Sequence, residues 1–251
     1  MQQPMSREAR LALAHRIAQH ARNAYSDKLK AIGLYGSTAR GTDGPYSDIE
    51  IFCVLRSRGE EFSYEWVAGP WKAEVDFYSE EILLTKAARV EGRWPLTHGA
   101  FTHVLPLWDP EDFFEELRAA AASPPEADFH LAVEGMLVGE LYEFAGKWRN
   151  AEARGETSHL PALAVETARY GALLLGLHHR RTYSTGSKLL EEALALPDRP
   201  DGFDPLCQRV MAGQLSDPKA VLEGLVRFWE GVQAWAAAHG YAIKSEQEIP
   251  F

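Results

Sequence analysis

Short apolar runs separated by polar loops predict a buried β-sheet in the first half of the chain. Some of these runs are almost continuously apolar, which is typical of a buried strand. Residues 71–78 instead alternate between apolar and polar side chains, as in a strand with two different faces. The polar stretch at residues 56–69 is expected to be a connection. The predicted strands are residues 31–35, 49–55, 71–78 and 100–108.

Apolar side chains at helical spacing predict helices around these strands. Pro124 and Pro125 interrupt the pattern, because two adjacent prolines cannot lie inside a helix, and beyond them the chain is helical almost throughout. The sequence therefore predicts an α+β fold with two domains, a sheet-and-helix domain at residues 1–125 and a helical bundle at residues 126–251. The predicted helices are residues 6–25, 81–91, 109–121, 128–150, 161–180, 187–196, 204–212 and 218–239.

Composition and charge narrow the class of protein. The chain has 251 residues, of which 46% are hydrophobic and 25% charged, as in soluble globular proteins, and its net charge is −10. No apolar run approaches the length of a membrane span, and the N-terminal residues lack the apolar core of a signal peptide, so we expect a cytoplasmic protein. The negative charge disfavours broad nucleic-acid binding and is compatible with attraction of a polycationic substrate.

Two carboxylates at the start of the second predicted strand indicate a metal site. Asp48 and Glu50 are two residues apart, so both side chains lie on the same face of the strand. A cation between them relieves their repulsion, and hard oxygen ligands suit Mg²⁺, which also binds phosphate oxygens. Glu74 and Asp76 share one face of the strand at residues 71–78, and either can supply a third carboxylate.

The turn after the first predicted strand carries groups that suit phosphate. Gly36 lets the backbone approach a ligand closely, Ser37 adds a hydroxyl donor, and Arg40 adds a planar cation. A glycine–serine pair alone is typical of an ordinary turn. The pair followed by Asp48-Ile49-Glu50 favours a nucleotide site.

Other polar patterns have simpler interpretations. By spacing alone, Glu143 and Lys147 are an ion pair on the surface of a helix. Residues 178–181, with two histidines and two arginines, are expected to be the solvated end of a helix. The chain contains no His-Glu-x-x-His and no Cys-x-x-Cys pattern, so no zinc site is predicted.

The nucleotide motif also resembles a known family. Gly36-Ser37, followed eleven residues after Ser37 by Asp48-Ile49-Glu50, resembles the signature of the polymerase-β-type nucleotidyltransferases. From about residue 30 to the last residue, the local sequence is similar to the aminoglycoside 4′-O-nucleotidyltransferases, the kanamycin nucleotidyltransferase family. The similar segments are residues 31–37, 43–50, 94–99, 145–150, 176–180, 213–217 and 249–251.

The resemblance implies a fold and a set of ligands for the first domain. The fold is a polymerase-β-like nucleotidyltransferase domain, with a mixed sheet and helices, followed by the helical bundle. The position in the family motif selects Glu74 over Asp76, although Asp76 lies on the same face. By resemblance, the Mg²⁺ ligands are Asp48, Glu50 and Glu74, and the nucleotide contacts are Gly36, Ser37, Arg40, Ser47, Lys147 and Thr185.

The resemblance also implies catalytic and substrate-binding roles. Glu143 is expected to be the general base, with Glu140 on the same helical face as a weaker candidate, and Lys147 is expected to act on the nucleotide phosphate. Ammonium groups of the substrate are expected to meet a rim of carboxylates. The rim residues are Glu60, Glu61, Glu65, Glu74 and Glu140.

The implied reaction is the transfer of AMP from Mg·ATP to the 4′-hydroxyl of an aminoglycoside, with release of pyrophosphate and resistance to the drug. In the family the active site lies between two subunits, so a homodimer is expected. One alternative is nucleotidylation of a protein or an RNA acceptor, although the net charge fits RNA poorly. Another is a non-catalytic nucleotide-binding or toxin–antitoxin module of the same fold, which the complete carboxylate set and Arg40 disfavour.

Overall fold

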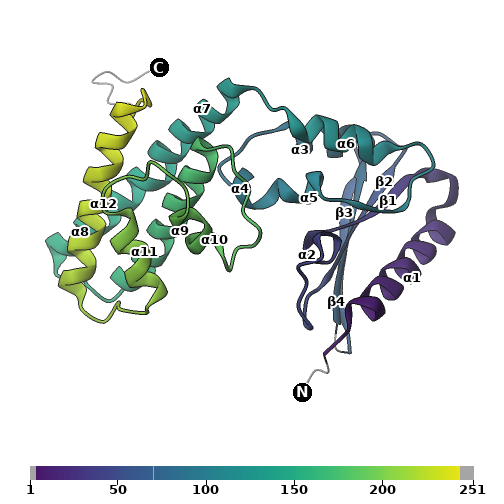
Figure 1. Cartoon of the computed structure of the whole chain (residues 1–251), viewed down its shortest axis with the longest axis horizontal. Helices are drawn as coiled ribbons and strands as arrows, with labels where there is room; N and C mark the ends of the chain where they lie inside the picture. Colours follow the sequence, from purple (N-terminus) through teal and green to yellow (C-terminus); the bar gives the residue numbers. More distant parts are fainter. Residues whose placement is uncertain (1–3, 70, 244–251) are drawn as a thin grey trace. The chain divides into compact units, whose positions relative to one another are not determined.

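The chain folds into two compact units, which we call the sheet unit and the helical unit (Figure 1). The computed structural model describes residues 4–69 and 71–243. The sheet unit contains the residues up to Arg89 together with His98–Pro124. The helical unit contains Val90–Thr97 and the residues from Pro125 onward. The division at Pro124 and Pro125 lies close to the boundary expected from the sequence, but Val90–Thr97, which was expected to belong to the first domain, packs with the helical unit.

The sheet unit contains one mixed sheet, whose strands in spatial order are β3 (Glu61–Ala68), β4 (Trp71–Ser79), β2 (Ile49–Leu55), β1 (Leu29–Tyr35) and β5 (Leu105–Trp108). β2 and β4 are parallel. β1 is antiparallel to both β2 and β5, and β3 is antiparallel to β4. The strand that follows Asp48 therefore lies directly beside the strand that carries Glu74, as predicted.

Helices cover both faces of this sheet (Figure 1). Alternate residues of β2 enter two separate cores: Ile51 and Cys53 pack on the side of α1, whereas Phe52 and Val54 pack on the opposite side. This division follows from the alternation of side chains along a strand. The helix on the first face is α1 (Arg7–Tyr25), and those on the second are α3 (Glu80–Ala88), α5 (Gly99–Thr102) and α6 (Phe113–Ala122).

The loop between β1 and β2 is tied to the start of α1. The side chain of Asp43, only 3% exposed, forms ion pairs with Arg7 and with the fully buried Arg10. Arg10 also donates hydrogen bonds to the backbone carbonyls of Gly44 (2.9 Å) and Ser47 (3.0 Å). Charge-assisted hydrogen bonds therefore fix the segment that leads into β2.

The helical unit is built around α9 (Leu160–His178), which contacts the other helices of this unit. Within the described ranges, α9 is the one helix long and apolar enough to cross a membrane, and 67% of its apolar window is buried inside the unit. A π-helical turn at Leu137–Leu141 separates two of its neighbours. The helices that contact α9 are α4 (Trp94–Thr97), α7 (Glu126–Met136), α8 (Tyr142–Arg154), α10 (Leu189–Leu194), α11 (Phe203–Met211) and α12 (Pro218–Ala238), and the π-helical turn lies between α7 and α8.

Three segments differ from the expectation based on sequence. Residues 56–69 are not a simple connection, because most of them form the edge strand β3, in which Phe62 and Trp66 pack toward the core under α1. From the sequence this stretch is expected to be a connection because its three glutamates, Glu60, Glu61 and Glu65, are typical of a solvated loop. Residues 100–108 contain the end of α5 before β5 begins, and the helix expected at 128–150 is divided by the π-helical turn.

Candidate active site

The turn from β1 into α2 (Gly36–Arg40) brings the backbone against a carboxylate. Gly36 has a φ angle of +74°, which glycine adopts without steric cost. A Cβ atom added here would lie 1.6 Å from Oε2 of Glu50 and 2.4 Å from its Cδ. Glycine is therefore required at this position both for its backbone angle and for the space that the Glu50 side chain occupies.

We expect Gly36→Ala to lower kcat/KM for nucleotidyl transfer by roughly a hundredfold or more in a protein that still folds, because the added methyl group must displace Glu50. Initial rates and thermal melts monitored by circular dichroism would measure the two effects. Gly59→Ala is the matched control, because Gly59 also has a φ angle of +74° but no described atom lies within 4 Å of its added Cβ. Equal losses of activity in both variants would assign the effect to backbone strain instead.

Glu50 lies in surroundings that disfavour its charge. Burial, and then the neighbouring carboxylate of Asp48, raise the pKa of Glu50 to about 7. Arg40 and a hydrogen bond from the backbone N–H of Ser37 act on it in the opposite direction. A divalent cation beside Asp48 and Glu50 would favour the charged form of both. This partly buried pair of carboxylates therefore fits the donor set that Mg²⁺ prefers.

A row of three carboxylates crosses the sheet next to this turn. Glu65 in β3 is paired with Glu74 in β4, and Glu74 is paired with Glu50 in β2. Paired residues on neighbouring strands have their side chains on the same face, so Glu65 is a neighbour of the predicted metal ligands. Burial, and then the charge of Asp76, raise the pKa of Glu74. The row concentrates negative charge on one face of the sheet.

Asp76, the alternative third carboxylate, is engaged in packing. Its Oδ2 accepts a buried hydrogen bond of 2.7 Å from the hydroxyl of Tyr35, and the residue is only 8% exposed. In the register it is paired with Phe52, two residues further along β2 than Glu50. These contacts support Glu74 as the third member of the site.

Lys72 is a charged neighbour of the site that the sequence-based prediction omits. Its Nζ lies 3.9 Å from Oδ2 of Asp48, and it also forms an ion pair with Glu65. The alternation at residues 71–78 places Lys72 on the same face as Glu74, so the sequence pattern was sufficient to identify Lys72 as a neighbour of the site. Lys72 partly balances the carboxylates at this end of the sheet.

The other predicted nucleotide contacts of the sheet unit lie around the same turn. Ser37 and Arg40 are partly buried in α2; the backbone N–H of Ser37 donates a hydrogen bond to Glu50, and the charge of Arg40 also lowers the pKa of Glu50. The hydroxyl of Ser47 accepts a hydrogen bond of 2.9 Å from the backbone N–H of Gly44. Ser47 therefore shapes the loop before β2, and its contact with a nucleotide stays a prediction.

Glu143 and Lys147 lie in the helical unit, near the start of α8. Oε1 of Glu143 is 2.7 Å from Nζ of Lys147, and this hydrogen bond raises the pKa of Lys147. Their side chains are 60% and 47% exposed, so the pair adds little to stability. Both groups are accessible to a ligand.

The π-helical turn at Leu137–Leu141 changes the relation of these groups to Glu140. Such a turn adds a residue to the helix, which rotates the faces before it relative to those after it, and such turns recur at functional sites. Glu140 lies within the turn, so α-helical spacing does not describe its position relative to Glu143, and its role as a weaker candidate for the base stays a prediction. The charges of Glu166 in α9 and of Glu140 nevertheless act on Lys147.

The remaining predicted contacts lie on the surface. Glu61 forms an ion pair of 2.9 Å with Lys86, and Glu60 is exposed just before β3. Neither of them belongs to the carboxylate row, in which Glu65 is the member that β3 supplies. Thr185 is exposed in the helical unit.

Both units match known proteins. A family model described as nucleotidyltransferase domain matches residues 17–93, and one described as KNTase C-terminal domain matches residues 111–242. The chain is 49% identical over 247 residues to an aminoglycoside nucleotidyltransferase (4′) of Staphylococcus aureus and equally to one of Bacillus sp., with 98% of each chain covered. The chain belongs to the aminoglycoside 4′-nucleotidyltransferase family.

A solved structure supports the fold of this 4′-nucleotidyltransferase family member. A nucleotidyltransferase-like protein from Exiguobacterium sibiricum matches with a TM-score of 0.56 at 13% identity, covering 90% of this chain and 77% of the other. At that identity the likeness concerns the fold alone. With the two family models, it confirms the predicted fold, a nucleotidyltransferase domain with a mixed sheet followed by a helical C-terminal domain.

Proposed function

We propose that this enzyme transfers AMP from Mg·ATP to the 4′-hydroxyl of an aminoglycoside antibiotic, with release of pyrophosphate. The observation that carries the proposal is the close contact of Gly36 with Glu50, beside Asp48, in a member of this family. Residues 1–125 would carry the nucleotide chemistry, and residues 126–251 would supply the base. The reaction would take place in the cytoplasm, where ATP is available, and would make the cell resistant to the drug.

In this proposal the sheet unit holds the triphosphate. Asp48, Glu50 and Glu74 would bind Mg²⁺, which would neutralise charge on the phosphates. Arg40 would donate hydrogen bonds to phosphate oxygens through its planar guanidinium, and Ser37 would add its hydroxyl. The raised pKa of Glu50 agrees with a carboxylate placed where a cation is needed.

The helical unit would supply the groups that act on the reacting atoms. Glu143 would accept the proton of the 4′-hydroxyl, whose oxygen then attacks the α-phosphate. The bond between the α-phosphate and the bridging oxygen breaks, and pyrophosphate leaves. Lys147, whose ammonium group lies 2.7 Å from Glu143, would stabilise the negative charge that develops on the α-phosphate.

We also propose that the enzyme is a homodimer with shared active sites. Asp48 and Glu143 belong to different compact units, and the resemblance implies that each chain lends the helix with Glu143 and Lys147 to its partner. The reaction needs an aminoglycoside and a nucleoside triphosphate and involves neither nucleic acid nor a membrane.

Raised ionic strength should weaken the binding of the aminoglycoside more than that of ATP. The drug carries several ammonium groups, and the row of Glu65, Glu74 and Glu50 offers charges that salt screens. Glu60 and Glu61 of the sheet unit and Glu140 of the helical unit would supply further carboxylates for the ammonium groups of the drug. Calorimetry should give a drug affinity that falls by roughly tenfold from low to high salt, and Glu65→Gln should reduce that slope.

Glu116→Gln is the matched control for this titration, because Glu116 is an exposed glutamate on α6 of the same unit. Its salt dependence should equal that of the wild type. A drug affinity that stays flat across the salt range would contradict a role for the carboxylate row in attracting the substrate.

The direct test is to incubate the enzyme with Mg·ATP and kanamycin and to analyse the products by mass spectrometry. An adenylated drug, with modification located at the 4′-oxygen by fragmentation, supports the proposal. Adenylation of a protein or an RNA in place of the drug would identify another acceptor. Nucleotide binding without any adenylated product would instead indicate a non-catalytic module.

A further inference from the structure

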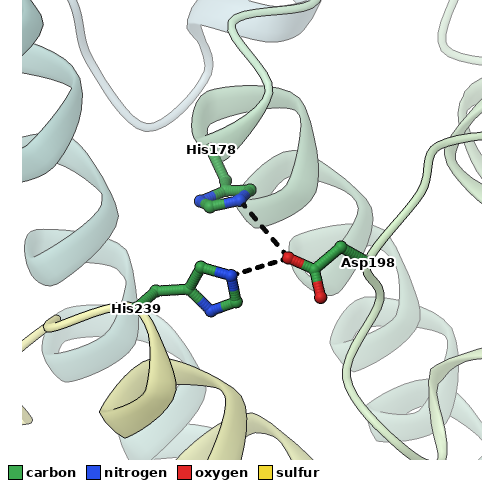
Figure 2. Close-up of side chains that lie close together, drawn as sticks. All are labelled: His178, Asp198 and His239. Atoms are coloured by element: carbon green, nitrogen blue, oxygen red, sulfur yellow. Dashed lines mark ion pairs between the residues drawn. The ribbon is translucent and has the colours of Figure 1, made fainter.

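Three side chains of the helical unit that play no part in the proposed reaction converge on one point (Figure 2). His178 ends α9, Asp198 lies between α10 and α11, and His239 follows α12. One ligand atom of each lies within 4.8 Å of those of the other two. Oδ2 of Asp198 is 2.6 Å from Nε2 of His239 and 3.9 Å from Nε2 of His178. Both imidazoles thus turn the same ring nitrogen toward a single carboxylate oxygen.

Hydrogen bonds on the far side of each ring leave these nitrogens available. Nδ1 of His239 lies 2.8 Å from the backbone carbonyl of Trp235, which can only accept, so the proton of a neutral ring is on Nδ1 and the lone pair on Nε2. Nδ1 of His178 lies 2.8 Å from the hydroxyl of Tyr241, which can accept in the same way. Outer hydrogen bonds of this kind orient histidines that bind metals.

The surroundings hold the three groups in place. The ring of His178 packs against those of Trp235 (4.8 Å) and His239 (4.7 Å), and its side chain is only 17% exposed. The backbone carbonyl of Asp198 accepts a hydrogen bond of 3.0 Å from Nε1 of Trp235. Asp198 has a φ angle of +54°, in the left-handed region that aspartate adopts more readily than most residues other than glycine.

The distances suit a tetrahedral metal. Ligand atoms about 2.0–2.1 Å from zinc at tetrahedral angles are roughly 3.3 Å apart. The distances from Oδ2 of Asp198 to the two histidine nitrogens, 2.6 and 3.9 Å, lie on either side of that value. Side-chain rotations that also bring the two histidine nitrogens, which lie within 4.8 Å of each other, to this separation would place all three ligands around one ion.

We propose that His178, Asp198 and His239 form a zinc site, with water as the fourth ligand. Two imidazoles and one carboxylate suit Zn²⁺ and disfavour Mg²⁺, which prefers oxygen ligands alone. The ion would join the ends of α9 and α12 to the loop before α11, so its binding would stabilise the helical unit. The absence of zinc-binding sequence patterns does not argue against the site, because its ligands come from three distant segments.

Without a metal, the same residues are an ion pair. A proton shared between His239 and Asp198 satisfies the contact of 2.6 Å, but it gives no role to Nε2 of His178, which lies too far from the carboxylate for a hydrogen bond. Zinc explains the orientation of both rings, and the two interpretations predict different responses to the ion.

The test uses the full chain in the Asp48→Asn background with excess Mg²⁺, so that the carboxylates of the sheet unit do not bind the probe. After removal of metals with a chelator, Zn²⁺ is titrated in competition with a chromophoric chelator, and thermal melts are recorded with and without Zn²⁺. We expect one Zn²⁺ per chain and a rise in melting temperature of roughly 5–10 °C at saturating zinc.

Asp198→Asn and His239→Gln should each weaken this affinity by roughly a hundredfold and remove the zinc-induced shift. His159→Gln is the matched control, because His159 is an exposed histidine of the same unit that directly precedes the start of α9, whereas His178 lies at the end of that helix. Each shift is measured against the same variant without zinc, so a loss of basal stability does not obscure the result. No zinc binding by the parent protein, or equal binding by all three variants, would reduce the group to an ion pair and overturn the proposal.

Discussion

Asp48→Asn is expected to lower nucleotidyl transfer by roughly a thousandfold or more while the metal-free protein remains at least as stable as the wild type. The loss of activity follows if Asp48 binds Mg²⁺, because a catalytic ion contributes several kcal/mol of charge stabilisation. The stability should hold or rise because the charge of Asp48 raises the pKa of Glu50, so its removal relieves repulsion. The substitution also removes the ion pair between Asp48 and Lys72 (3.9 Å), but this pair is partly exposed to solvent and contributes little to the free energy of unfolding.

Initial rates with Mg·ATP and urea unfolding in the presence of a chelator would measure the two effects. Asp27→Asn is the matched control, because Asp27 is an exposed aspartate of the same unit, just before β1. It should leave both quantities unchanged. Asp48→Asn protein that keeps its activity in Mg²⁺ would refute the assignment of this carboxylate to the metal.

A mixture of two inactive variants should recover activity if the active sites are shared between chains. Asp48→Asn disables the sheet unit and Glu143→Gln disables the helical unit, so each homodimer lacks one group in both of its sites. A mixed dimer has one site in which both groups are intact. With random pairing, half of the dimers are mixed and each has one good site in two, so the recovery should approach roughly a quarter of the wild-type rate.

The matched control mixes Asp48→Asn with Glu50→Gln. Both substitutions lie in the sheet unit, so no pairing restores a complete site and no activity should return. Native mass spectrometry would establish in each mixture that subunits have exchanged. Exchange without recovery in the first mixture would mean that each chain assembles its site from its own two units.

The sequence predicted those parts of the site that depend on local spacing. Glu50 lies in β2 and Asp48 directly precedes this strand, where its charge acts on Glu50, and the glycine–serine turn follows the end of β1. The strand at residues 71–78 was also predictable, because its strict alternation separates the core side from the charged side. Its parallel pairing with β2 then placed Glu74 beside Glu50.

Features that depend on tertiary contacts were not predictable in this way. β3 is an edge strand with one exposed face, so its glutamates resembled those of a loop, and the place of Glu65 in the carboxylate row became visible only from the strand register. The π-helical turn changes the phase of a helix without changing its hydrophobic pattern. His178 and His239 end two different helices, and only the packing of those helices brings them to Asp198.

The path of the chain between the units limits how the gene can recombine. Val90–Thr97 belongs to the helical unit although it lies between two parts of the sheet unit. Trp94 packs edge-on against Phe129 at 4.8 Å, and the carbonyl of Pro95 accepts a hydrogen bond of 2.6 Å from the backbone N–H of Tyr183. A crossover at Pro124–Pro125 between two family members would therefore join a helical core to eight residues from the other parent. Chimaeras that exchange Val90–Thr97 together with the downstream segment keep that core intact.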